Sequence, residues 1–214
     1  MLELGSKFLL SYFLGSIMGA LVMGRLAGGV DIRTMGSGNA GGTNALRTQG
    51  WMFALGVMII DVGKGMVATG LVPQLPIVTE EPAIARNWLT LACAAAAVIG
   101  HVWPLWHNFR GGKGAATLLG TFAVLAPWVL LPVLLVWAWM LVLFGYVGLA
   151  TISAAAFAPL YLLMTRWPGE QALLVYTAVM ALYILYAHRS NLLRMRAGTE
   201  HRHSSVMLFR KKRD

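Results

Sequence analysis

The sequence predicts an all-α polytopic membrane protein, and the observations behind this prediction are its composition, its apolar runs and the placement of its charges. Of 214 residues, 58% are hydrophobic and 12% are charged, whereas about a quarter of the residues of a soluble domain are charged. A backbone in hydrocarbon must make its hydrogen bonds within its own segment, and the apolar runs lack the alternation of a membrane barrel. We therefore expect every span to be a helix.

Apolar runs recur along the chain at lengths that suit bilayer crossings of about 20 residues. The five runs are Phe8–Ala27, Trp51–Val72, Asn87–Gly100, Thr117–Thr165 and Gln171–His188. The fourth run has 49 residues; one crossing would leave about thirty of them unplaced, whereas three short helices would use them all. Pro127, Pro132 and the 145–148 stretch are the expected breaks. The count is therefore seven transmembrane helices, with five as the fallback.

Charged residues between the runs predict the topology. The tail, 189–214, holds eight Lys or Arg residues, and the connection 73–86 carries Glu80 and Glu81 with one Arg. The other basic residues that flank connections are Arg25, Arg33, Arg47, Arg110 and Lys113. Because basic connections stay in the cytoplasm, we expect a periplasmic N-terminus and a cytoplasmic C-terminus. Nothing marks a second domain, so residues 1–214 are predicted to form one integral-membrane domain with a basic cytoplasmic tail.

Three polar segments lie on the predicted cytoplasmic side. They read MGSGNAGGTNALR from Met35, GHVWPLWHNFRGGKGAAT from Gly100 and AHRSNLLRMRAGTEHR from Ala187. Each combines glycines, small hydroxyl or amide side chains and a cation, which together suit phosphate. The alternative is that they are turns in which Gly and Asn supply positive φ angles. Plain turns do not require so many polar side chains, so we favour phosphate binding.

Several other chemistries are not supported by the spacing. The Gly36–Gly41 stretch matches GxGxxG, but that fingerprint has meaning only in a βαβ unit, and no strand pattern accompanies it. Gly114 follows Lys113 where a P-loop needs Ser or Thr. The five histidines show no metal-ligand spacing with cysteines or carboxylates. The one cysteine, Cys93, lies in an Ala-rich apolar run and is expected to be a packed thiol. No cofactor and no metal are expected.

Ionisable residues inside or next to spans form a further set of candidates. Asp61 and Lys64 are three apart and share one helical face. They are either a structural ion pair facing the bundle interior or a support behind the first polar segment. His188 stands at a predicted helix end, with Asn191 three positions on. We expect His188 to contact substrate or to handle a proton.

Together these segments resemble the motifs of the bacterial membrane acyl-phosphate:glycerol-3-phosphate acyltransferases, the PlsY family. GSGNAGGTNALR is similar to the first motif, HNFRGGKGAAT to the second and HRSNLLRMRAGTEHR to the third, and the DVGKG stretch from Asp61 is also similar. Ala40, Gly42 and Ser190 depart from the residues that are common in that family. The departures leave the candidate site residues in place.

The resemblance implies a seven-helix protein of the bacterial inner membrane whose active site faces the cytoplasm. It implies that the primary hydroxyl of glycerol 3-phosphate takes an acyl group from acyl phosphate, giving lysophosphatidic acid and inorganic phosphate in the first step of phospholipid biosynthesis. Membrane lipids and the soluble acyl-phosphate-forming enzyme are the implied partners, and nucleic acid is not one. A transporter of a phosphorylated solute is the rival class; inverted repeats would mark it, and none is evident.

The candidate site residues come from the three polar segments. Those assigned to catalysis are Ser37, Arg47, Lys113, His188 and Asn191. Those assigned to substrate binding are Gly36, Gly38, Asn39, Gly41, Thr43, Asn44, Gly111, Gly112, Gly114 and Glu200. An acyl phosphate is already activated, so positioning and charge stabilisation suffice without a covalent intermediate. The base is either His188 or the departing phosphate.

Overall fold

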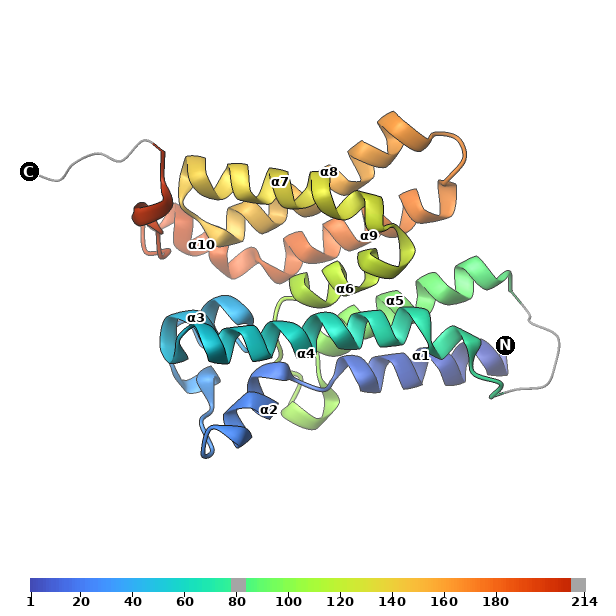
Figure 1. Cartoon of the computed structure of the whole chain (residues 1–214), viewed down its shortest axis with the longest axis horizontal. Helices are drawn as coiled ribbons and strands as arrows, with labels where there is room; N and C mark the ends of the chain where they lie inside the picture. Colours follow the sequence, from blue (N-terminus) through green and yellow to red (C-terminus); the bar gives the residue numbers. More distant parts are fainter. Residues whose placement is uncertain (78–83, 209–214) are drawn as a thin grey trace, which may run out of the picture. The chain divides into compact units, whose positions relative to one another are not determined.

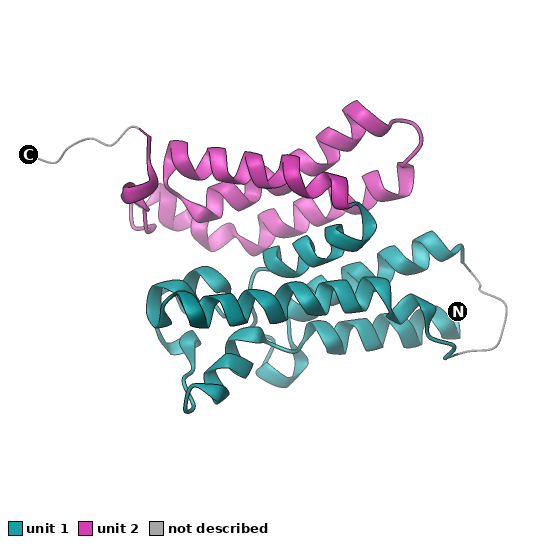
Figure 2. Cartoon of the chain, viewed as in Figure 1, with its two compact units in different colours: residues 1–126 teal, residues 127–214 magenta. Residues whose placement is uncertain are grey.

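The computed structural model describes residues 1–77 and 84–208, which form two compact helical units, 1–126 and 127–214. Figures 1 and 2 show the chain and its units. The described residues contain helices and turns and no strand, as the sequence predicts. Glu80 and Glu81, and the basic residues from Arg210 to Arg213, lie outside the described residues.

The first unit is organised around its longest helix, α4. Its α-helices are α1 (Leu2–Gly15), α2 (Gly19–Leu26), α3 (Gly42–Gln49), α4 (Trp51–Gly70), α5 (Arg86–Val102) and α6 (Ala115–Leu125). Short 3₁₀ turns occur at Ile32–Thr34, Val72–Gln74 and Leu105–His107. Helix α4 packs against α1, α2, α3, α5 and α6. The polar segments that begin at Met35 and Gly100 are therefore held by helices that all touch α4.

Small residues let α4 and α6 approach closely. A Cβ atom added at Gly65 of α4 would overlap the backbone oxygen of Thr117, and one at Gly120 of α6 would overlap that of Val62. Close backbone contact through small residues is the usual way in which membrane helices pack, because lipid offers no hydrophobic driving force between them. This contact anchors the helix that follows the GGKG sequence.

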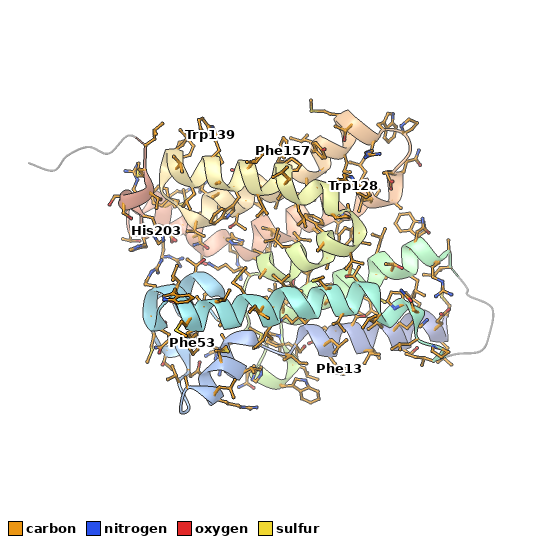
Figure 3. The ribbon with its side chains drawn as sticks, in the orientation of Figure 1. Phe13, Phe53, Trp128, Trp139, Phe157 and His203 are labelled. Carbon is orange, nitrogen blue, oxygen red and sulfur yellow. The ribbon has the colours of Figure 1, made fainter. Side chains whose placement is uncertain are left out.

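The second unit contains α7 (Pro127–Phe144), α8 (Val147–Arg166), α9 (Gln171–Ala187) and α10 (Arg189–Arg196), with a 3₁₀ turn at Ser204–Val206. Helix α8 packs against both α7 and α9, and α10 contacts both α8 and α9. The segment after α10 caps the end of α7: the amide of His203 donates to the Gly145 oxygen at 2.8 Å, and Arg202 Nε donates to the Phe144 oxygen at 3.0 Å. His203 is labelled in Figure 3. The cap satisfies carbonyls that a helix end leaves without intrahelical partners.

Helix lengths are consistent with an integral membrane protein. Among the described residues, four helices are long and apolar enough to cross a bilayer, and the number is six if two bent helix pairs each form one span. Helix α6 is apolar but has only 11 residues. Apolar side chains are exposed on α7, where Trp139 (Figure 3) is 60% exposed. The predicted count of seven stays a prediction.

The fourth apolar run does form three helices, but one predicted break is wrong. The breaks fall at Ala126, before Pro127, and at Gly145 and Tyr146. Pro132 lies inside α7. It lies in the second turn of α7, where the amide that a proline lacks would have donated to the oxygen of Trp128, the second residue of the helix, so one hydrogen bond near the start of the ladder is lost.

Candidate active site

The first polar segment is shaped by Asn44, whose side chain is buried at the start of α3. Its Oδ1 accepts from the Ser37 amide at 2.9 Å, and its Nδ2 donates to the Ile32 and Met35 oxygens at 2.9 and 3.1 Å. A side-chain amide that bonds three backbone groups replaces the regular ladder that this loop lacks. Asn44 was predicted to bind substrate; in the structure, its side chain holds the loop before α3 in its conformation.

Polar groups of this segment face solvent around the N-terminus of α3. Gly36 and Gly38 have φ angles of 57° and 70°, values that favour glycine because it has no Cβ. Ser37, between them, is exposed, as are Thr43 and Arg47. Thr43 and Arg47 are four residues apart and so lie on one face of α3. Exposed hydroxyls and a guanidinium at a helix N-terminus, whose first backbone amides have no intrahelical acceptor, suit a phosphate group.

A charged pair braces the chain just before this segment. Arg33 Nη2 lies 2.7 Å from Asp31 Oδ2, and Asp31 Oδ1 also accepts from the Arg33 amide at 2.9 Å. The Arg33 guanidinium holds the pKa of the Asp31 carboxyl below its ordinary value of 3.8, and Asp31 in turn raises the pKa of Arg33. The charge of Arg33 is thus balanced by Asp31, and Arg47 is the cation that lies within the segment MGSGNAGGTNALR itself.

The second polar segment folds back on the end of α5. The amide of Gly111 donates to the Val102 oxygen at 3.2 Å, and that of Gly112 to the His101 oxygen at 3.0 Å. Gly114, with φ of 85°, is the N-cap of α6. Lys113 therefore lies between two backbone hydrogen bonds and a helix start, which fixes its Cα on both sides.

Beneath this segment lies the ion pair that the sequence predicts in α4. Lys64 Nζ is 2.9 Å from Asp61 Oδ1, and the two side chains are 5% and 1% exposed. His101 of α5 joins them, with its Nδ1 2.8 Å from Lys64 Nζ. The predicted pairing of Asp61 with Lys64 in the interior of the first unit is confirmed. Sequence reasoning gave His101 no role, although a charged pair inside an apolar helix itself indicates that a further polar partner is needed.

The third polar segment, in the second unit, places His188 and Asn191 at a bend. His188 lies between α9 and α10, which are bent by 49°, so the two residues are not on one continuous helix. His188 Nδ1 is 2.8 Å from the Ile184 oxygen. Because a carbonyl can only accept, the hydrogen of the neutral ring is on Nδ1 and the lone pair is on Nε2. Nε2 is thus the nitrogen that can take a proton.

Glu200 holds the other end of this segment together. Its Oε1 accepts from Asn191 Nδ2 at 2.8 Å, and its Oε2 accepts from Arg194 Nε at 2.7 Å. The first contact orients the Asn191 side chain, and the second holds the Glu200 carboxylate in place for it. Sequence reasoning missed Arg194, although its place three residues after Asn191 puts the two on one face of α10.

The predicted residues thus fall into two groups, one in each unit. The first unit holds Gly36, Ser37, Gly38, Asn39, Gly41, Thr43, Asn44, Arg47, Gly111, Gly112, Lys113 and Gly114, and the second holds His188, Asn191 and Glu200. The first group offers hydroxyls, amides and cations for phosphate. The second offers an imidazole that can act as a base.

The profile of the glycerol-3-phosphate acyltransferase family matches residues 6–198. The chain belongs to this family. This acyltransferase is 38% identical over 208 residues to the glycerol-3-phosphate acyltransferase of Salinibacter ruber, covering 92% of this chain and 91% of the relative. It is 39% identical over 203 residues to that of Rhodospirillum rubrum, covering 94% and 91%. The resemblance seen in the three polar segments is therefore confirmed along nearly the whole chain.

The acyltransferase also resembles solved structures. The crystal structure of PlsY (YgiH), an integral membrane glycerol 3-phosphate acyltransferase, in its glycerol 3-phosphate form matches with a TM-score of 0.80 at 35% identity, covering 93% of this chain and 94% of that one. Its lysophosphatidic acid form matches with a TM-score of 0.79 at 34% identity, with the same coverage. The all-helical fold is thus that of an integral membrane acyltransferase.

Proposed function

We propose that this membrane glycerol-3-phosphate acyltransferase uses acyl phosphate as its donor and releases lysophosphatidic acid and inorganic phosphate. Membership of the family and the similarity to PlsY support the acceptor. Support for the donor comes from the chemistry of the chain: its polar segments present phosphate-binding groups, and none of its five histidines is followed five positions on by Asp, the spacing of acyltransferases that use acyl-CoA or acyl carrier protein.

The observation that carries the proposal is the set of groups around the N-terminus of α3. Ser37, Thr43 and Arg47, with the amides of the glycine-rich segment, would hold one phosphate by hydrogen bonds and charge. Asn39, Gly36, Gly38 and Gly41 would allow backbone amides to approach it. Lys113, flanked by Gly111, Gly112 and Gly114, would neutralise the leaving phosphate as a point charge.

In the reaction, the primary hydroxyl oxygen of glycerol 3-phosphate forms a bond to the acyl carbon, and the bond between that carbon and the phosphate oxygen breaks. The hydroxyl proton goes to His188 Nε2 or to the departing phosphate. The hydrogen bond of His188 Nδ1 to the Ile184 oxygen supports the first route, because it leaves the lone pair on Nε2. Asn191, oriented by Glu200, would position glycerol 3-phosphate.

We infer seven transmembrane spans in the bacterial inner membrane, with the N-terminus periplasmic and the C-terminus and active site on the cytoplasmic side. The basic connection before α6 and the basic tail lie on one side under the positive-inside rule. An even number of crossings must therefore separate them, and α6 to α9 make four. Helix α6 is about 17 Å long at 1.5 Å per residue, which local thinning of the bilayer would accommodate.

We propose further that residues 1–214 work as one acyltransferase domain, with membrane lipids around it. The soluble enzyme that forms acyl phosphate would deliver the donor at the cytoplasmic face.

Phosphate release by the detergent-purified protein tests the function. Palmitoyl phosphate and palmitoyl-CoA are supplied in parallel, each with and without glycerol 3-phosphate, and lysophosphatidic acid is measured by mass spectrometry. Release of phosphate from palmitoyl phosphate that depends on glycerol 3-phosphate is expected. Lysophosphatidic acid formed from palmitoyl-CoA and not from palmitoyl phosphate would refute acyl phosphate as the donor. No product from either donor would favour the transporter alternative.

A further inference from the structure

A buried polar cluster lies directly under the GGKG sequence in the first unit. Asp61 and Lys64 come from α4 and His101 from α5, and their side chains are 1%, 5% and 3% exposed. The reaction proposed above uses none of the three. Burying charged groups is costly unless every one is paired and hydrogen-bonded, so the arrangement of the cluster has to be explained.

The Lys64 ammonium has three hydrogens and three acceptors. They are the Ile17 oxygen at 2.6 Å, His101 Nδ1 at 2.8 Å and Asp61 Oδ1 at 2.9 Å. An ammonium can only donate, so Nδ1 of His101 accepts and the hydrogen of the neutral ring lies on Nε2. Asp61 Oδ1 is farther from His101 Nδ1, at 3.5 Å. Lys64 is therefore the partner that sets the orientation and tautomer of the ring.

The Nε2 side of this ring faces Gly112. A Cβ atom built on Gly112 would overlap His101 Nε2, and one built on Gly111 would overlap the His101 oxygen. The His101 backbone oxygen also accepts a hydrogen bond from the Gly112 amide at 3.0 Å. His101 thus meets the segment through both its ring and its backbone, one residue before Lys113.

We propose that His101, oriented by Lys64, which is itself paired with Asp61, is a positioning residue that sets where the Gly112 backbone lies and hence where Lys113 presents its ammonium. The proposal rests on the assignment of Lys113 to the leaving phosphate. His101 itself does not act as a base, because the lone pair on its Nδ1 accepts a hydrogen bond from Lys64. The neutral ring of His101 carries its hydrogen on Nε2, whereas that of His188 carries it on Nδ1.

Two substitutions of His101 test the contact on the Nδ1 side of the ring and the contact on the Nε2 side separately. His101→Asn keeps an oxygen near the place of Nδ1, where Lys64 can donate to it, and removes the atoms that reach Gly112. His101→Gln carries its amide to the place of Nε2 and loses the acceptor near Lys64. Substituting Asp61 or Lys64 is a poorer test, because each would leave the other charge buried and unpaired and so endanger folding.

The test combines each substitution with Gly112→Ala and measures kcat and KM for glycerol 3-phosphate with palmitoyl phosphate as donor. Gly112→Ala alone should lower kcat by about 10- to 100-fold with a smaller change in KM, since Lys113 acts on charge that develops in the transition state. In the His101→Asn background the methyl has room, so Gly112→Ala should cost about fivefold or less; in the His101→Gln background the full loss should persist.

Hydrogen exchange of the 110–114 amides, followed by mass spectrometry, gives a second readout that does not depend on activity. Exchange should rise in Gly112→Ala and in His101→Asn, and Gly112→Ala should add little further exchange in the His101→Asn background, whereas Cys93→Ala, a buried change on the same helix, should leave both exchange and turnover at wild-type values. Equal losses in both histidine backgrounds, with unchanged exchange, would overturn the positioning role. An inactive wild-type protein with the expected exchange pattern would refute the proposed function and not this inference.

Discussion

Replacing Asn44 with alanine should uncouple the first polar segment from α3. The side chain is 2% exposed and makes three hydrogen bonds, to the Ser37 amide and to the Ile32 and Met35 oxygens. Each contributes about 1 kcal/mol net, so Asn44→Ala should weaken the ordered loop by about 3 kcal/mol. Because each 1.36 kcal/mol is tenfold, the predicted loss in kcat/KM for glycerol 3-phosphate is about 150-fold where the ordered loop is needed for binding.

The assay is phosphate release at fixed palmitoyl phosphate with glycerol 3-phosphate varied, accompanied by hydrogen exchange at the Ser37 amide. Asn44→Asp should be as harmful as Asn44→Ala, because it keeps the acceptor for Ser37 but turns an oxygen toward two carbonyls. Thr48→Val is the matched control on the same helix: it removes only the bond from Thr48 Oγ1 to the Asn44 oxygen and should cost about threefold or less. Activity of Asn44→Ala within about threefold of wild type, with unchanged exchange at Ser37, would refute the reasoning.

Three further predictions concern charged groups. Arg47→Ala, Lys113→Ala and His188→Ala each remove a group that is proposed to contact substrate. Each should lower phosphate release by about 100-fold or more without loss of folded protein. Wild-type turnover by all three variants would refute the site assignment. Glu200→Gln should lower the thermal midpoint in detergent by a few degrees and weaken turnover, because one amide cannot accept from both Asn191 and Arg194; an unchanged midpoint would contradict it. Asp31→Asn should cost about 0.5 kcal/mol of stability at neutral pH. Because the folded pKa of Asp31 is lowered, that difference should be full above the ordinary pKa and vanish as the pH falls through the folded pKa, and a difference that grows in acid would refute the role of Arg33.

The sequence predicted the helices better than their ends. The fourth apolar run was long enough for three helices, and its breaks next to Pro127 and at Gly145 follow from residues that end helices. Pro132 was misread, because a proline near a helix start displaces few hydrogen bonds and whether it breaks a helix depends on where that helix begins. The short helices α2, α3 and α10 were not predicted, since each has eight residues and such helices depend on tertiary packing.

The candidate site shows the same division. The prediction that the three polar segments bind phosphate rests on residue types alone, because glycines, hydroxyls and cations at close spacing suit a phosphate group. The roles of Asn44, His101 and Arg194 were not visible. Each acts through contacts that only the folded chain brings together: Glu200 is six residues from Arg194, and Lys64 is 37 residues from His101. Composition carries no information about such contacts.

By itself, the sequence determined that this chain is an all-helical membrane protein of the glycerol-3-phosphate acyltransferase family with three phosphate-suited segments. Hydrophobicity and the helix period act locally, and motif residues are read in order. Only the tertiary structure decided that Asp61 and Lys64 share their charge with His101, that Asn44 holds its own loop and that Glu200 orients Asn191. Those contacts form because packing buries polar groups that must then find hydrogen-bond partners, and the partners are chosen by proximity in space, not along the chain.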